Sequence, residues 1–410
     1  MVTPTPAPEG RDPRSWPMLG VLSLSVLAGM SVWFAQSAVA PELQLRWGWS
    51  ATQVGWLTSA VQVGFVAGTL LAAILNLADI LPSRRYFALS ALLAAGANLL
   101  LVVLPGWEAA LVTRFLTGFF LAGVYPPAMK MAATWFVSAR GLAIGTVVGA
   151  LTVGKAIHYL VHALGGADPG LVVGSTSVAA VGAALLILVA YRDGPNPFER
   201  RPFRWALARE VFRIREWRLV TAGYCGHMLE LYSYWTWLAA YLAASQVVGE
   251  PSLLAFVAIA LGGAGCIWGG AVADRIGRER LVNRAMAVSG GCALLVGFVF
   301  QIPWLLVGVA MIWGVAVIMD SAQFSALVTE RVPSYAVGTA LTLQTSLGFA
   351  VTVATVQLVP TLAEAFGWRW SFAILALGPA LGIAAIRRLG RGTGMAQTPE
   401  TSGGSAIPDR

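Results

Sequence analysis

The segment GGAVADRIGRER at residues 269–280 joins an apolar run to a charged loop, and an earlier segment repeats its pattern. ADILPSRR at residues 78–85 also follows an apolar run, at an offset of 195 residues, and a third match has an offset of 197. The matched pairs are Asp79 with Asp274, Arg85 with Arg280, and Gly141 with Gly338. Two nearly equal offsets indicate a duplicated unit.

The composition places both copies in a membrane. The chain of 410 residues is 57% hydrophobic and 11% charged, whereas about 25% of the residues of a soluble domain are charged. So few charged residues cannot cover a water-facing surface, and we therefore expect an integral membrane protein. The three cysteines all lie in apolar runs, so the sequence offers neither a disulfide framework nor a metal-binding spacing.

Apolar runs of about 20 residues predict an all-α membrane protein with twelve transmembrane helices. The predicted spans are 17–40, 52–75, 86–104, 109–134, 141–163, 171–191, 219–244, 252–272, 282–300, 303–327, 338–361 and 369–386. The longest polar stretch, 192–218, separates two pseudo-symmetric six-helix bundles. The expected units are an N-terminal tail (1–16), a first bundle (17–191), a linker (192–218), a second bundle (219–386) and a C-terminal tail (387–410).

The positions of the basic residues predict the orientation of these helices. With the N-terminus inside, 22 of the 27 lysines and arginines fall on the cytoplasmic side, as positively charged loops do. Both termini, the linker and both tails are then cytoplasmic, and we expect the inner membrane of the cell as the location. Within the linker, RWALAREVFRIREWR can form an amphipathic helix on the membrane surface. The net charge of +8 reflects topology and contact with anionic lipid, rather than nucleic-acid binding.

The sequence resembles the major facilitator superfamily of secondary transporters over about residues 17–390. The most specific match is GGAVADRIGRER, which resembles the signature loop of that family. RFLTGFFLAGVYPP at 114–127 and GWRWSFAILALGP at 367–379 are further matches. The resemblance implies transport by rocking of two bundles about a central site.

The signature loop is the candidate gate. Gly269 and Gly270 allow close helix packing, Asp274 can cap a neighbouring helix, and Arg275 and Arg278 can bridge to acids on the cytoplasmic face. The corresponding residues of the first half are Asp79 and Arg85. That copy has Ile80, Pro82 and Ser83 where the family has Arg, Gly and Arg.

Ionisable residues inside the spans are the candidate site residues, because a charge within a bilayer is costly. Of the 27 basic residues only two are lysines, Lys130 and Lys155, and both lie within spans, as do all three histidines. On span 141–163, Lys155, His158, Tyr159 and His162 share one stripe, with His162 nearer the interface. On span 109–134, Arg114 shares a face with Gly118 and Tyr125, whereas Lys130 lies near the cytoplasmic end.

Span 219–244 carries a second group of candidates. His227, Glu230, Tyr234 and Trp237 occupy one arc of the helix, and in the family this helix lines the central cavity. We therefore expect the arc to face the transport path, with Glu230 able to carry a proton. A Glu230–His227 pair that only holds the bundle together is the structural alternative. Asp320, with Gln323 nearby, supplies a further acid on span 303–327.

Buried cations in the first half and buried acids in the second predict proton-coupled transport of a small organic anion. We expect the acids to face the cations and neutralise them in the empty protein. Proton-driven efflux of amphipathic, drug-like compounds is one alternative, and a non-transporting sensor or assembly factor with a transporter fold is another. We expect no enzymatic activity, no cofactor and no metal. The expected partners are the small-molecule substrate, protons and the lipid bilayer, without nucleic acid, for a protein that acts as a monomer.

Overall fold

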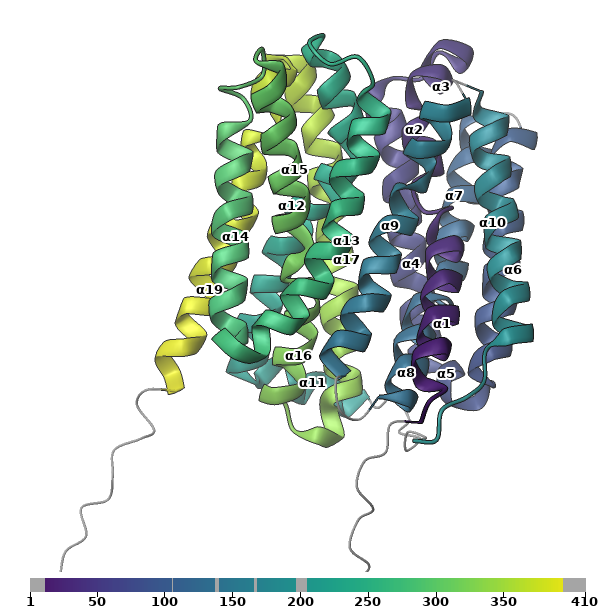
Figure 1. Cartoon of the computed structure of the whole chain (residues 1–410), viewed down its shortest axis with the longest axis vertical. Coiled ribbons are helices and arrows are strands. Elements are labelled where there is room, and N and C mark those ends of the chain that lie inside the picture. Colours follow the sequence, from purple (N-terminus) through teal and green to yellow (C-terminus); the bar gives the residue numbers. More distant parts are fainter. Residues whose placement is uncertain (1–11, 105, 137–139, 166–167, 197–204, 394–410) are drawn as a thin grey trace, which may run out of the picture.

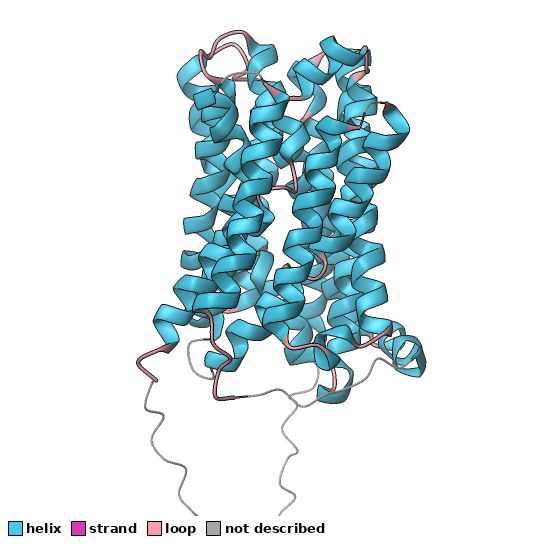
Figure 2. Ribbon diagram, turned by 90° about the vertical axis from the view of Figure 1, so that its right-hand side faces the viewer, coloured by secondary structure: helices cyan, strands magenta, loops and turns pink. Residues whose placement is uncertain are grey.

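The computed structural model describes residues 12–104, 106–136, 140–165, 168–196 and 205–393. These residues form helices joined by short loops, without a strand (Figure 2). The helices before the linker are α1 (Ser15–Met30), α2 (Ala35–Ala38), α3 (Ala40–Trp47), α4 (Ala51–Ile74), α5 (Leu77–Ile80), α6 (Ser83–Val103), α7 (Trp107–Leu121), α8 (Tyr125–Trp135), α9 (Arg140–Gly165) and α10 (Pro169–Ala190).

The later helices begin in the linker. They are α11 (Trp205–Arg213), α12 (Arg215–Ser245), α13 (Pro251–Ile276), α14 (Arg278–Leu295), α15 (Pro303–Met319), α16 (Ser321–Arg331), α17 (Val337–Phe366), α18 (Trp368–Ser371) and α19 (Leu377–Thr393), with short 3₁₀ turns η1 (Ser334–Ala336) and η2 (Ala373–Ala376). The amphipathic segment of the linker thus divides into α11, which packs against α17, and the first turn of α12.

Each predicted span overlaps a helix or a pair of consecutive helices. In the described part of the chain, nine helical stretches are long and apolar enough to cross a membrane. The three predicted spans outside this set fall on α1–α2, α12 and α14. The first is interrupted, and the other two carry polar and charged side chains that lower their hydropathy. Membrane crossing by these three stays a prediction.

Four predicted spans are broken rather than continuous, and the last of them, 369–386, passes through α18, η2 and α19. Span 17–40 turns between Met30 and Ala35, span 109–134 breaks between α7 and α8, and span 303–327 breaks at Asp320. The break before α8 has a local cause, because Pro126 and Pro127 lack backbone N–H groups and are tolerated only at a helix start. The breaks in α7–α8 and α15–α16 lie nearly 197 residues apart, which matches the offset of the internal repeat.

The helices up to α10 and those from α12 onward stand on opposite sides of the molecule (Figure 1). Helices α9 and α13 pack along each other between the two sides, and so do α4 and α17. The α9–α13 contact is backbone against backbone: a Cβ added to Gly149 would lie 2.7 Å from the carbonyl oxygen of Gly263. Glycines at such positions let two helices approach closely.

Hydrogen bonds between described side chains of α4 and α17 join the two sides. The hydroxyl of Thr352 donates to Gln62 (2.6 Å), and the amide of Gln357 donates to the Ser59 hydroxyl (3.0 Å). These residues lie in the first half of α4 and the second half of α17, which the charge distribution places toward the outside. The two sides are therefore tied together on the predicted outer side.

Candidate functional site

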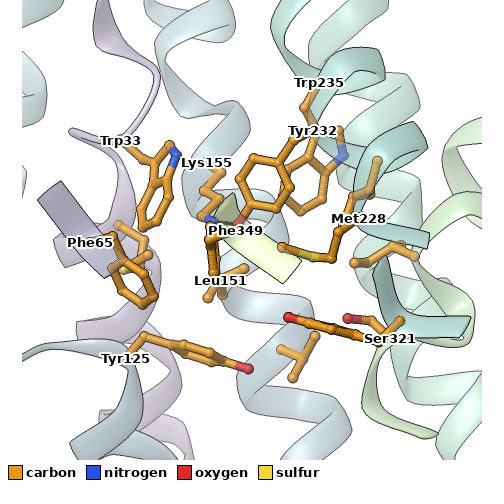
Figure 3. A pocket seen from close by; sticks show the side chains of 15 residues that line it. Trp33, Phe65, Tyr125, Leu151, Lys155, Met228, Tyr232, Trp235, Ser321 and Phe349 are labelled. Carbon is orange, nitrogen blue, oxygen red and sulfur yellow. Dashed lines mark hydrogen bonds between the residues drawn. The ribbon is translucent and has the colours of Figure 1, made fainter. Parts of the chain in front are cut away.

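A small cavity of about 40 Å³ lies between the two sides (Figure 3). A space of this size holds a few water molecules but no organic solute. Its walls include Met30, Trp33, Phe65, Tyr125, Leu151 and Lys155 from the first side, and Tyr224, Met228, Tyr232, Trp235, Ser321 and Phe349 from the second. Both sides contribute, so relative movement of the sides would change the size of the cavity.

Lys155 is the one charged side chain among the described residues that line this cavity. The lysine is 2% exposed, and its Nζ hydrogen-bonds the hydroxyl of Tyr232. It lies 3.7 Å from the ring centroid of Trp33, 5.4 Å from that of Trp235 and 5.7 Å from that of Phe349. Within the described residues Lys155 has no carboxylate partner at ion-pair distance, so aromatic faces and one hydroxyl stabilise its charge.

Arg114 lies behind the cavity rather than in its wall. The fully buried guanidinium donates to Asn98 Oδ1 (2.7 Å) and to the backbone carbonyls of Val32 (3.1 Å) and Trp33 (2.5 Å). These carbonyls belong to the turn between α1 and α2, where they have left the helical hydrogen-bond pattern. Arg114 therefore stabilises the break that presents Trp33 to the cavity. The structure therefore does not place Arg114 in contact with a solute in the cavity.

The other candidate residues on the helices of Arg114 and Lys155 have different surroundings. Tyr125, at the start of α8, lines the cavity. Tyr159 donates from its hydroxyl to the Trp235 carbonyl at 3.0 Å and so connects the two sides. His158 is fully buried, and neither of its ring nitrogens has a hydrogen-bond partner among the described residues. His162 lies farther along α9, 3.4 Å from Glu42 of α3.

The expected arc of α12 points into the second side instead of the cavity, which corrects the prediction. Glu230 accepts hydrogen bonds from Ser289 of α14 (2.9 Å) and Trp313 of α15 (2.8 Å). In the same arc, Tyr234 donates to the backbone of α15 at 2.7 Å, and Trp237 donates to the backbone of α17 at 2.9 Å. The reason is that neighbouring helices of the same side offer these polar groups partners.

The cavity is faced by other residues of α12, which the sequence analysis did not select as a site. Met228, Tyr232 and Trp235 lie in its wall. Phe65 and Phe349 were also missed, because a phenylalanine in an apolar helix is ordinary. The tyrosine and tryptophan content of α12 was the available signal, but it did not distinguish one face from another.

His227 pairs with Asp320, not with Glu230. Its Nδ1 lies 2.9 Å from Asp320 Oδ1, and both side chains are buried. Asp320 ends α15 at the break, next to Ser321 in the cavity wall. The acids therefore do not face the cations as predicted, because the hydrogen-bond partners of Lys155, Arg114 and Glu230 are all uncharged groups.

At the predicted cytoplasmic end, Arg278 joins the start of α14 to α16. Its guanidinium donates to Gln323 Oε1 (2.7 Å) and to Glu330 Oε1 (2.6 Å). A second ion pair joins Arg331 of α16 to Glu279 of α14, at 2.7 Å. Gln323 therefore contacts the signature loop rather than the cavity.

The remaining gate candidates make few contacts that can be described. Arg85 and Arg275 are exposed. The adjacent Arg84 lies 3.9 Å from Asp193 at the start of the linker. The side chains of Asp79 and Asp274 lie outside the described residues, so the expected capping by Asp274 has no structural test here.

Solved structures support the architecture. A bacterial homologue of the human lysosomal transporter Spinster, in an inward-facing and unoccupied conformation, matches with a TM-score of 0.74 at 13% identity, covering 96% of this chain and all of that one. Its inward-facing, occupied form matches with a TM-score of 0.68 at 16% identity, over 93% and 98% of the two chains. A single-residue mutant of the nucleoside transporter NupG gives a TM-score of 0.68 at 14% identity, over 92% and 99%. At these identities the likeness concerns the fold.

The sequence itself establishes the family. No curated protein matches the chain at a significant level. The family model of the Major Facilitator Superfamily, however, matches residues 21–356. The chain therefore belongs to the Major Facilitator Superfamily of multi-pass membrane transporters, which carry small-molecule solutes.

Proposed function

We propose that this protein couples the movement of a small organic anion to protons, with the central cavity as the solute site and Lys155 as its charged contact. The observation that carries the proposal is the position of Lys155: a buried ammonium group in the cavity wall, without a carboxylate partner among the described residues. An anion entering the cavity supplies the missing counter-charge. A charge-assisted hydrogen bond of this kind is about twice as strong as a neutral one.

The proton is proposed to act in the second side. Glu230 and the Asp320–His227 pair are buried ionisable groups within it, and neither contacts a lysine or arginine among the described residues. Asp320 adjoins the cavity through Ser321, so solute binding and proton uptake can affect each other through the α15–α16 break. Linked equilibria of this kind are reciprocal.

The motion is proposed to be rocking of two bundles, residues 17–191 and 219–386, on either side of the linker. The bonds from Thr352 to Gln62 and from Gln357 to Ser59 hold one end closed. We further propose that this end faces outward, that both termini are cytoplasmic, and that a monomer in the inner membrane is the working unit.

A competition assay in proteoliposomes tests the charge of the solute. A screen first identifies a transported compound, and anionic, neutral and cationic compounds of similar size then compete for its uptake with and without a pH gradient. Lys155→Ala should weaken binding of an anion about tenfold or more, and that of a neutral analogue far less. Arg46→Ala is the matched control, since Arg46 is an exposed cation on α3. Best competition by cations, retained in Lys155→Ala, would contradict the proposal.

Proton-driven efflux of amphipathic cations is the second candidate. It is favoured by the aromatic rings around the lysine ammonium, because such rings also bind organic cations. The two candidates differ in the effect of removing the lysine charge. Lys155→Met should strengthen binding of a cation if the rings serve cations, and should weaken binding of an anion if the lysine serves anions.

A further inference from the structure

Aromatic rings from the two sides meet at Lys155. Trp33 and Phe65 come from the first side, and Tyr232 and Phe349 from the second (Figure 3). Ring centroids across the boundary lie 4.6 Å apart for Phe65 and Phe349, 5.4 Å for Trp33 and Phe349, and 5.9 Å for Trp33 and Tyr232. These are the separations of favourable aromatic pairs. Ring-to-ring contacts therefore join the two sides at the cavity, next to the single charged side chain of Lys155.

The polar side chains of the cavity wall are few. Apart from Lys155, they are the hydroxyl groups of Tyr125, Tyr224, Tyr232 and Ser321 and the indole N–H groups of Trp33 and Trp235, which have no hydrogen-bond partner among the described residues. A solute with many hydroxyl or amide groups would leave most of them without partners, at a cost for each. The wall therefore suits a solute with one charged group and an otherwise apolar body.

The size of the cavity determines how such a solute can enter. A benzene ring needs a cavity of about 150 Å³, whereas the present one measures about 40 Å³. The two sides must separate to admit a ring, and separation breaks the contacts of Phe65 and Trp33 with Phe349. A planar aromatic solute inserted between them restores ring-to-ring contacts on both its faces. An aliphatic solute of the same size fills the space without restoring them.

We infer that the solute is a small aryl carboxylate, whose carboxylate binds the Lys155 ammonium and whose ring lies between Trp33 and Phe65 on one side and Tyr232 and Phe349 on the other. This inference rests on the proposed function and narrows it. The charge on the solute follows from Lys155, and the planar ring follows from the four aromatic side chains, so the two parts can be tested separately.

Calorimetric titration of the purified full-length protein with four probes makes that separation. Benzoate is the aryl carboxylate, cyclohexanecarboxylate has its charge and size without the aromatic ring, benzamide has its ring without the charge, and benzylamine has the ring with the opposite charge. Benzoate should bind about 3- to 10-fold tighter than cyclohexanecarboxylate, and at least about tenfold tighter than benzamide. Benzylamine should bind most weakly.

Two variants locate the preference in the cavity. Phe349→Leu should reduce the affinity for benzoate to that for cyclohexanecarboxylate and leave the latter unchanged. Phe298→Leu is the control, because Phe298 is 65% exposed and packs against Trp370 away from the cavity. It should change neither affinity.

The possible outcomes test the aryl carboxylate separately from the broader proposal of an anionic solute. Equal affinities for benzoate and cyclohexanecarboxylate, or no binding of any probe at millimolar concentration, would overturn the aryl carboxylate and leave a different anion open. Tighter binding of benzamide or benzylamine than of both carboxylates would overturn the anionic solute itself. An unchanged benzoate preference in Phe349→Leu would show that the ring binds elsewhere.

Discussion

At the scale of single residues, Arg114 helps to shape the cavity although it does not line it. Its guanidinium binds Asn98 and the carbonyls of the turn that carries Trp33. The planar fork of arginine suits several acceptors at once, which a lysine cannot reproduce. Arg114 is therefore a positioning residue for Trp33.

Arg114→Ala should lower the free energy of unfolding by about 2–4 kcal/mol, because it leaves buried acceptors unsatisfied. Solute affinity should fall with it, and Arg114→Lys should recover only part of both losses. Thermal unfolding in detergent and calorimetric binding measure the two effects. Unchanged stability combined with lost binding would instead place Arg114 in contact with the solute.

Glu230 is the residue on which proton coupling is most directly testable. Glu230→Gln removes the ionisable group but keeps an oxygen that can accept from Trp313, and its amide N–H can donate to the Ser289 hydroxyl where the second carboxylate oxygen accepted. Accumulation driven by a pH gradient should be lost in this variant, whereas exchange of solute across the membrane should persist. Glu364→Gln, at an exposed carboxylate near the end of α17, should behave as wild type. Normal gradient-driven uptake by Glu230→Gln would remove Glu230 from the mechanism.

Helix pairs, rather than single helices, are the working elements. Helix α16 begins with Ser321 in the cavity wall, and near its other end Glu330 and Arg331 pair with Arg278 and Glu279 of α14. The two ends of α16 thus connect the cavity with the signature loop. Movement of the loop is therefore expected to change the position of α16 and hence the wall of the cavity.

Arg278→Ala should change the rate of solute exchange severalfold while leaving solute affinity within about threefold, because it shifts a conformational equilibrium and not the site. Exchange rates in proteoliposomes and calorimetric affinities provide the comparison. The control is Arg280→Ala, an exposed arginine two residues along α14. A collapse of affinity with an unchanged rate would rule out this role for Arg278.

The elements also show what could be predicted from the sequence. Hydropathy located the spans, and internal repetition located the loops. The face of α12 could not be read, because Glu230, Tyr232, Tyr234 and Trp235 are all buried, so the helix has no solvent-facing side against which to orient the others. The break in the first span has no proline or glycine pair to signal it, and it depends on Arg114, which is 81 residues away from Trp33.

At the scale of the whole molecule, α4 and α17 join the two sides toward the predicted outer end. A double variant with Ser59→Cys and Gln357→Cys, treated with a short bifunctional thiol reagent, should lose solute exchange because that end can no longer open. Exchange should return after cleavage of a reducible reagent. Each single variant, treated alike, is the control for modification of one position and for reaction at the native cysteines. Full exchange in the cross-linked double variant would show that this end does not open during transport.

The glycine contact between α9 and α13 has a geometric consequence for that motion. Backbone packs on backbone at Gly149 and Gly263, with Val153 as the neighbouring side chain, so we expect the two helices to roll on each other without parting. In the proposed rocking motion, the line of contact between α9 and α13 is the rotation axis. Atoms far from this axis move more than atoms close to it. Lys155 lies on α9, the helix that also carries Gly149. The ammonium group would then stay nearly stationary while the walls around it swing, so that one fixed charge faces each side of the membrane in turn.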